Sequence, residues 1–245
     1  CRLLPNGGSL RDLSYKVFKR KKAMLEGHDI SFITCSKWLE KEVRKSALLT
    51  NQQIQTIPNP IDTRIFRPHD KKQARLRVNL PLDMKVILFV AQRITNENKG
   101  IFYLIDACHK MAAEHPEMVH NTFVAVLGGG RGNIGDVFDF CTGKLGYVND
   151  TQQIVDIYNA ADVFVLPSLS ENLPNTIMEA MACGVPCVGF KVGGIPEEID
   201  HKKNGYVAEY RDADDLARGL HWVLCEADHE ALSREAVHKV ATNYS

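Results

Sequence analysis

The sequence predicts an α/β fold built on a doubly wound parallel sheet, and two observations support this class. Short apolar runs without polar alternation, such as V-I-L-F-V-A at residues 86–91 and V-F-V-L at 163–166, are typical of strands buried on both faces. Segments with the apolar spacing of helices follow these runs after polar or glycine-containing loops. Strands and helices that alternate along a chain form a parallel sheet covered by helices.

Composition and charge exclude several classes of protein. The 245 residues are 44% hydrophobic, which is enough for one large or two small cores. The 30 Lys and Arg residues balance 30 Asp and Glu residues, and without a basic excess we expect no nucleic-acid partner. No apolar run approaches the roughly 20 residues of a membrane-spanning helix. Seven scattered cysteines without a C-x-x-C pair indicate free thiols in the reducing cytosol.

Two helices and two strands are expected in the opening part of the chain. We predict a helix at 10–26, a strand at 30–34, a helix from Ser36 to about Leu48 and a strand at 54–57. The first helix carries the basic segment K-R-K-K. This segment is either a solvated helix face or a patch that contacts anionic lipid, and the sequence leaves both interpretations open.

A proline-rich segment then marks a domain boundary. I-P-N-P-I-D-T-R-I-F-R-P contains three prolines in twelve residues, which make a stiff, extended connector. We therefore divide the chain into a first part at 1–57, a linker at 58–68 and a second domain at 69–245. Strands of the second domain are expected at 86–91, 122–127, 145–148, 163–166, 185–189 and 204–207, and helices at 101–115, 150–158, 174–184, 196–198, 212–224 and 230–240.

Two glutamates lie in the central strand–loop–helix segment of this domain. Glu171 is in the loop that follows the strand at 163–166, and Glu179 is inside the next helix. Open α/β sheets bind ligands at the carboxyl ends of their strands, and a helix N-terminus there favours an anion. A carboxylate accepts two hydrogen bonds side by side, which suits the vicinal hydroxyls of a ribose or another sugar. The alternative is that both are ordinary solvated glutamates.

Two cations and a glycine-rich segment follow the first strands of the domain. Arg93 and Lys99 lie on the loop after the strand at 86–91, where they are either surface charges or an anion site. The segment G-G-G-R-G-N-I-G at 128–135 contains a G-x-G-x-x-G match, so an NAD(P) site is a rival hypothesis. That motif belongs on the first strand of a βαβ unit, however, and here another strand precedes it.

We predict no metal site. Asp212-Ala213-Asp214 has the form of a D-x-D metal motif, but an Asp at a helix start is an N-cap that also favours the helix dipole. None of the nine histidines stands in an H-E-x-x-H or comparable pattern.

The central segment as a whole resembles a known family signature. S-x-x-E-N-L-P-N-T-I-M-E-A-M-A-C-G-V-P-C-V, followed by G-G-I-P-E, is similar to the donor-binding signature of retaining glycosyltransferases of family 4, which have the GT-B fold. The resemblance extends over most of the chain. The sequence departs from the family pattern at Pro60, at Gln92 and at 172–174, where members usually have Gly, Gly and Gly-Phe-Gly.

The resemblance implies roles for individual residues. Glu171 would contact the hydroxyls of the donor sugar and Glu179 those of the ribose, while Arg93 and Lys99 would contact the donor diphosphate. The implied catalytic residues are Glu171, Arg93 and Lys99. The other implied donor-binding residues are Gly129, Gly130, Asn172, Leu173, Pro174, Asn175, Gly193 and Gly194.

The implied activity is transfer of a sugar from a UDP- or GDP-sugar to a saccharide or lipid-linked acceptor, without a metal or other cofactor, in glycan biosynthesis. The expected location is cytoplasmic, with peripheral membrane contact through the first domain. The alternatives are a nucleotide-sugar-binding fragment without turnover and a nucleotide-sugar epimerase of the same fold. The resemblance implies that residues 1–57 are the C-terminal remnant of an acceptor-binding domain and that residues 69–245 are the donor-binding domain. Because most of the acceptor-binding domain would precede this chain, we expect the fragment to be inactive alone.

Overall fold

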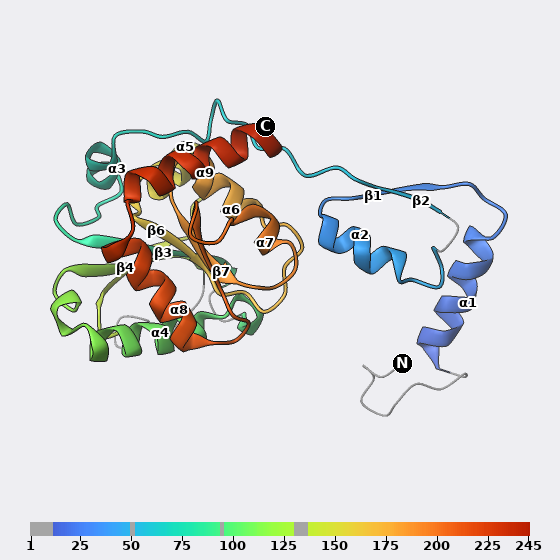
Figure 1. The fold of residues 1–245 in the computed structure, drawn as a ribbon, viewed down its shortest axis with the longest axis horizontal. Helices are drawn as coiled ribbons and strands as arrows, with labels where there is room; N and C mark the ends of the chain where they lie inside the picture. Colours follow the sequence, from blue (N-terminus) through green and yellow to red (C-terminus); the bar gives the residue numbers. More distant parts are fainter. Residues whose placement is uncertain (1–11, 50–51, 94–95, 130–136) are drawn as a thin grey trace. The chain divides into compact units, whose positions relative to one another are not determined.

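The computed structural model describes residues 12–49, 52–93, 96–129 and 137–245. The chain divides into two compact units, residues 1–57 and residues 58–245. Figure 1 shows the elements of both units in the order of the sequence.

The first unit is small and has a two-stranded parallel sheet. Its elements are α1 (Leu13–Leu25), β1 (Ser31–Thr34), α2 (Lys37–Arg44) and β2 (Gln53–Thr56). Ser36 caps α2 as predicted, because its side chain accepts a hydrogen bond from the Leu39 amide at 3.0 Å. The predicted extension of this helix to Leu48 is wrong. The Ser46 side chain accepts a bond from the Leu48 amide, and such local side-chain contacts compete with helix continuation.

Helix α1 has no buried residue, and only its Tyr15 and Leu25 side chains are half-buried. The K-R-K-K segment at 19–22 is exposed, and the apolar side chains of Leu13, Val17 and Met24 are exposed beside it.

The second unit alternates strands and helices. Its strands are β3 (Lys85–Arg93), β4 (Thr122–Gly129), β5 (Cys141–Gly146), β6 (Val163–Leu166), β7 (Cys187–Phe190) and β8 (Gly205–Ala208). Its α-helices are α3 (Lys71–Arg77), α4 (Ile101–Glu114), α5 (Thr151–Ala160), α6 (Asn175–Ala182), α7 (Ile195–Glu198), α8 (Ala213–His221) and α9 (His229–Asn243). Short 3-10 turns η1 (Glu97–Lys99) and η2 (Pro116–Met118) flank α4, and a π-helical turn, η4 (Trp222–Glu226), follows α8.

The strands of this unit form one parallel sheet in the order β5-β4-β3-β6-β7-β8. This confirms the predicted doubly wound α/β class. The chain builds outward from β3 to β5, crosses back to place β6 beside β3, and then builds outward in the other direction. The order of the strands thus reverses between β3 and β6. In open α/β sheets, ligands bind outside the carboxyl ends of the strands at such a reversal.

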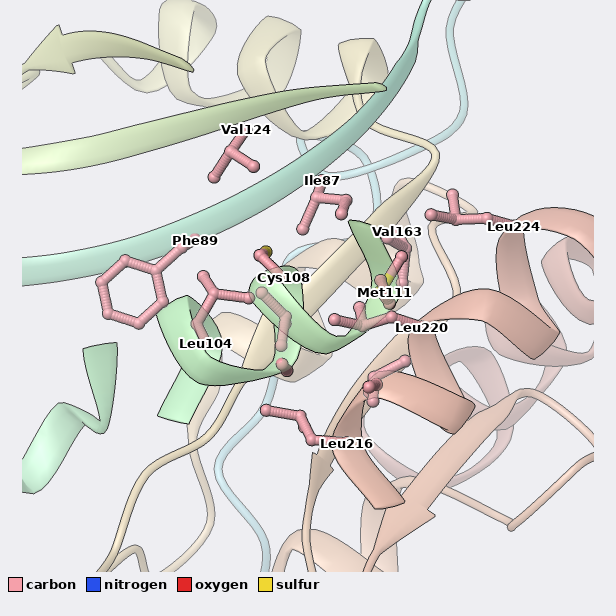
Figure 2. Packing of buried hydrophobic residues seen from close by; sticks show 14 of the residues in the cluster. Ile87, Phe89, Leu104, Cys108, Met111, Val124, Val163, Leu216, Leu220 and Leu224 are labelled. Atoms are coloured by element: carbon pink, nitrogen blue, oxygen red, sulfur yellow. The ribbon is translucent and has the colours of Figure 1, made fainter. Parts of the chain in front are cut away.

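Helices cover both faces of the sheet. Helices α4 and α8 lie on one face, and α3, α5, α6 and α9 lie on the other (Figure 1). Figure 2 shows the core of the α4 and α8 face, where Leu104 and Met111 of α4 lie near Ile87 of β3 and Leu220 of α8. All four side chains are essentially inaccessible to water, so this packing supplies a large share of the hydrophobic stabilisation.

Two predicted strands are displaced, each for a physical reason. The strand predicted at 185–189 is observed as β7, Cys187–Phe190, because Pro186 has no N–H to donate to the ladder. The strand predicted at 145–148 is observed as β5, Cys141–Gly146. It is an edge strand with an exposed and half-buried pattern, so its residues lack the apolar run by which the buried strands are recognised.

Helix α3 was not predicted. Its sequence, KKQARLR, is highly charged, and tertiary ion pairs hold it. Arg75 is buried and pairs with Asp162 at 2.6 Å, and Arg77 pairs with Asp156 at 2.8 Å. Residues 58–68, predicted as a linker, belong to the second unit, where the buried Ile61 donates its amide to the Tyr244 carbonyl at 2.6 Å.

The interpretation of Asp212-Ala213-Asp214 as a helix start is confirmed. Asp212 is the N-cap of α8, and its side chain accepts a hydrogen bond from the Asp215 amide at 2.9 Å. The helix ends at His221, three residues before the predicted end, and continues as the π-helical turn η4.

Candidate functional site

The predicted site residues that the structure describes gather at the carboxyl edge of the sheet. Arg93 and Gly129 end β3 and β4, and Lys99 lies in η1 after β3. The loop after β6 carries Glu171, Asn172, Leu173 and Pro174; α6 carries Asn175 and Glu179; the loop after β7 carries Gly193 and Gly194. Gly130 lies outside the described residues, as do the glycines of the rival dinucleotide motif.

An ion pair connects the two loops at the point where the strand order reverses. The Lys99 Nζ lies 2.6 Å from the Glu171 Oε1. Lys99 comes from the loop after β3 and Glu171 from the loop after β6, so the pair joins the loops that follow these two neighbouring strands. The side chain of Glu171 is 13% exposed and that of Lys99 is 32% exposed. Both groups can therefore be reached by a ligand while remaining partly shielded from water.

A glycine lets the two loops approach closely. Gly100 has φ 71°, the left-handed region that other residues rarely adopt. A Cβ at this position would lie 1.8 Å from the Pro167 carbonyl oxygen, so no larger residue fits without separation of the loops. The Leu169 amide donates to the Asn98 carbonyl at 2.8 Å. Sequence reasoning identified Lys99 in this loop but not these contacts.

Two further glycines, Gly193 and Gly194, contact the other side of the Glu171 loop. Gly193 has φ 59°, and a Cβ there would lie 1.8 Å from the Glu171 carbonyl oxygen. A Cβ on Gly194 would lie 2.1 Å from the Asn172 carbonyl oxygen, and the Gly194 amide donates to that oxygen at 2.6 Å. The Glu171 loop is thus fixed between the loops that follow β3 and β7.

Arg93 and Gly129 lie opposite each other at the ends of adjacent strands. They are register partners in the β3–β4 ladder, after an irregularity that begins at Val90. The Arg93 side chain is exposed, and within the described part of the chain no acidic group forms a salt bridge with it. This cation is therefore available at the same edge of the sheet as Lys99.

The N-terminus of α6 opens at this edge. Its N-cap is Pro174, whose side chain makes no capping hydrogen bond. The first-turn amides of a helix without a capping side chain can bind an anion, which the helix dipole also favours. Asn175, the first residue of α6, accepts a side-chain hydrogen bond from Asn59 at 3.2 Å.

Glu179 lies one turn further along α6 and is held by a tyrosine. The Tyr158 hydroxyl, on α5, donates to the Glu179 Oε2 at 2.8 Å. Burial raises the pKa of the Glu179 carboxyl, and the hydrogen bond from Tyr158 opposes that shift. Tyr158 was not identified from the sequence, where it is one apolar position of a helix among many.

A third carboxyl group near this edge is fully buried. Glu198, at the end of α7, has no exposed surface, and neither of its carboxyl oxygens has a hydrogen-bond partner in the described residues. Burial raises its pKa well above the ordinary 4.5, the negative charges of Glu171 and Glu197 raise it further, and Lys239 acts in the opposite direction. The folded chain therefore keeps this carboxyl protonated at a pH where the unfolded chain ionises it.

The arrangement suits an anionic ligand that also carries hydroxyl groups. Cations and helix amides are available for negative charge, and two carboxylates are available for hydroxyls. The described residues include no group of three or more His, Cys, Asp or Glu side chains that could hold a metal ion.

A comparison with protein families decides the relationship. The family described as glycosyl transferases group 1 matches residues 84–226. The chain belongs to this family. A D-inositol 3-phosphate glycosyltransferase from Thermobispora bispora is 32% identical over 203 residues, which are 76% of this chain and 46% of that protein. An N-acetyl-alpha-D-glucosaminyl L-malate synthase from Bacillus anthracis is 28% identical over 178 residues, 68% of this chain and 43% of that protein. The chain spans less than half the length of these two relatives.

Solved structures have the same type of fold as this chain. A sucrose-phosphate synthase from Thermosynechococcus elongatus aligns with a TM-score of 0.78 and 24% identity, covering 98% of this chain and 60% of that one. Anabaena HepE, solved in complex with UDP-glucose, aligns with a TM-score of 0.75 and 17% identity, covering 97% and 66%. These similarities show the GT-B type of fold that the sequence predicts.

Two further findings concern the helices and the cysteines of the chain. Within the residues that the structure describes, none of its helices has the length and apolarity needed to cross a bilayer. The cysteines in the described ranges are free thiols, and three of them, Cys108, Cys183 and Cys187, are buried.

Proposed function

We propose that the second unit is the donor-binding part of a retaining glycosyltransferase. It would bind a UDP- or GDP-sugar, and the whole enzyme would move the sugar to a saccharide or lipid-linked acceptor in polysaccharide or glycan biosynthesis. The proposed location is the cytoplasm, with peripheral contact at the cytosolic face of a membrane.

The observation that carries this proposal is the Lys99–Glu171 pair at the strand-order reversal. It places a cation and a carboxylate side by side at 2.6 Å, where α/β sheets bind nucleotides. A sugar diphosphate needs both partners, because its phosphates require positive charge and its hydroxyls require acceptors. Membership of the family and the similarity to HepE, whose structure contains UDP-glucose, support the same ligand class.

The chemistry assigned to the site is electrostatic. When the sugar leaves the nucleotide, negative charge develops on the diphosphate, and the proposed stabilising groups are Arg93, Lys99 and the N-terminus of α6. Cations and hydrogen-bonding N–H groups that are already fixed in place lower the barrier, because they need no rearrangement during the reaction. Glu171 would bind the sugar hydroxyls and Glu179 the ribose hydroxyls. The proposed reaction uses no metal ion.

Nucleotide binding tests this proposal directly. We expect UDP- or GDP-sugars to raise the melting temperature of the chain, since a ligand that binds only the folded state stabilises it by mass action. Calorimetry with the same compounds should give a saturable 1:1 isotherm. If neither UDP, GDP nor any of their sugars binds, the donor-site assignment is wrong.

A second candidate is a nucleotide-sugar-binding unit without turnover in this chain by itself. It is favoured by the coverage of less than half of the relatives' length and by the location of all described site residues on one unit. Transfer requires donor and acceptor in one cleft, so we expect this chain to bind the donor without transferring sugar. Sugar transfer by these 245 residues alone would contradict the proposed two-domain division of donor and acceptor.

A further inference from the structure

We propose that Tyr158 positions the Glu179 carboxylate for the ribose hydroxyls of the donor nucleotide. This inference rests on the proposed function, because it takes Glu179 as the group that binds the ribose. Tyr158 itself is then a positioning residue, which acts through Glu179 rather than on the ligand.

The contact joins two neighbouring helices on one face of the sheet. The Tyr158 hydroxyl on α5 donates to the Glu179 Oε2 on α6 at 2.8 Å. A glutamate side chain has several rotatable bonds, and a hydrogen bond to one oxygen selects a small part of its conformations. A carboxylate fixed before binding loses less conformational freedom when the ligand arrives.

The tyrosine hydroxyl is itself held in place. Tyr158 is 1% exposed. Its ring makes edge-to-face contacts with Phe164 of β6, at 5.9 Å between centroids, and with Phe66, at 6.3 Å. These contacts come from both the sheet and the segment before α3, and they restrain the ring that carries the hydroxyl.

The geometry leaves the carboxylate able to bind a diol. An ionised carboxylate has about four lone-pair positions on its two oxygens, and the tyrosine hydroxyl occupies one position on Oε2. The positions that remain on both oxygens suit two vicinal hydroxyls. The ionised form is the better acceptor for both hydroxyls, because a protonated carboxyl has turned one oxygen into a donor and keeps less acceptor capacity.

The surroundings of Glu179 make its ionisation depend on Tyr158. The titratable groups that face this pair are Cys183, the residue that follows α6, and Cys187 on β7. Burial raises the pKa of both thiols, that of Cys183 to about 12, so they stay neutral where a glutamate titrates. Burial also raises the pKa of Glu179, and the bond from Tyr158 lowers it. Loss of that bond would therefore raise the pKa of Glu179 further.

The test is Tyr158→Phe, with Tyr206→Phe as the matched control. Both substitutions remove a tyrosine hydroxyl that donates to a carboxylate at 2.8 Å, and the partner of Tyr206 is Asp215, in the β8–α8 region rather than on α5 or α6. Calorimetry would measure the affinity of wild type and both variants for UDP and GDP, and for the 2′,3′-dideoxy analogues of each.

We expect Tyr158→Phe to have about tenfold lower affinity than wild type for UDP or GDP, whichever of the two wild type binds more tightly. Affinity for its dideoxy analogue should be unchanged, because the lost contact acts through the ribose hydroxyls. The ratio of ribonucleotide affinity to dideoxy affinity cancels the effect of phosphate ionisation. As the pH is lowered, this ratio should begin to fall at a higher pH in Tyr158→Phe than in wild type. Tyr206→Phe should match wild type in every measurement.

Three outcomes would overturn the inference. If Tyr158→Phe binds UDP and GDP as Tyr206→Phe does, the hydroxyl does not position Glu179. If wild type shows the same ratio of ribonucleotide to dideoxy affinity between about pH 4 and 8, the ribose contact does not depend on Glu179, and this measurement needs no variant. If wild type binds neither nucleotide, the proposed function fails first and the inference fails with it.

Discussion

Gly100→Ala is the substitution for which the structure gives the sharpest expectation. An alanine there has to adopt φ 71°, and its Cβ would lie 1.8 Å from the Pro167 carbonyl oxygen. Gly146→Ala provides the control, because Gly146 has φ 74° but a Cβ there would have no atom within 4 Å. The two substitutions therefore share the strain of a left-handed alanine, about 1–2 kcal/mol, and differ in the clash.

The clash has a magnitude that follows from the contacts. The loops that follow β3 and β6 would have to separate, with loss of the Asn98–Leu169 hydrogen bond, about 0.5–1.5 kcal/mol. Forced repacking of a tight site adds about 1–3 kcal/mol. We expect Gly100→Ala to be about 1.5–4.5 kcal/mol less stable than Gly146→Ala. For a unit of this size that corresponds to a melting temperature roughly 3–18 °C lower.

Urea and thermal unfolding of the two variants measure this difference, and nucleotide calorimetry shows its effect on the site. Separation of the loops would also move Lys99 away from Glu171, so Gly100→Ala should weaken donor binding while Gly146→Ala should not. Equal unfolding free energies for the two variants would show that the close approach of the loops at Gly100 is not a structural requirement.

Three further predictions concern carboxyl and cationic groups of the second unit. The contribution of protonated Glu198 is fully present below its unfolded pKa near 4.5 and is lost as pH rises through its raised folded pKa. Glu198→Gln should therefore melt higher than wild type by a margin that grows above that pH; parallel melting curves at all pH values would contradict this. Arg93→Ala or Lys99→Ala should weaken UDP or GDP binding by about 1.5–3 kcal/mol, and calorimetry that shows unchanged affinity in both would end the diphosphate assignment. Glu179→Ala should weaken free nucleotide and nucleotide sugar alike, whereas Glu171→Ala should weaken only the nucleotide sugar; equal losses for both ligands in Glu171→Ala would show that its role is misassigned.

Much of the second unit could be predicted from the sequence because its central strands are buried on both faces. The strand predicted at 163–166 is observed with the same bounds, since four consecutive apolar residues fit no other environment so well. Helix starts followed from local chemistry in the same way. Asp150 and Asp212 cap α5 and α8 through hydrogen bonds to amides three residues later, a signal that lies within a few residues of sequence.

The elements that the sequence placed poorly depend on partners far along the chain. Helix α3 is stabilised by ion pairs to Asp156 and Asp162, about 80 residues away. Its own sequence has no apolar pattern, and these distant partners cannot be recognised from it. Strand β5 has a single strand neighbour, β4, and its half-exposed residues carry no continuous apolar run.

The sequence by itself determined which residue types follow each strand, and so it identified Arg93, Lys99, Glu171 and Glu179 as candidates. Only the tertiary structure decided which of them meet. Lys99 and Glu171 are 72 residues apart, and they form a pair because the chain crosses back to set β6 beside β3. The contact between Tyr158 and Glu179 likewise depends on tertiary packing, since no local pattern brings a tyrosine of one helix to a glutamate of the next. Strand order and helix packing are properties of long-range contacts, and a sequence pattern of period 2 or 3.6 reports only local ones.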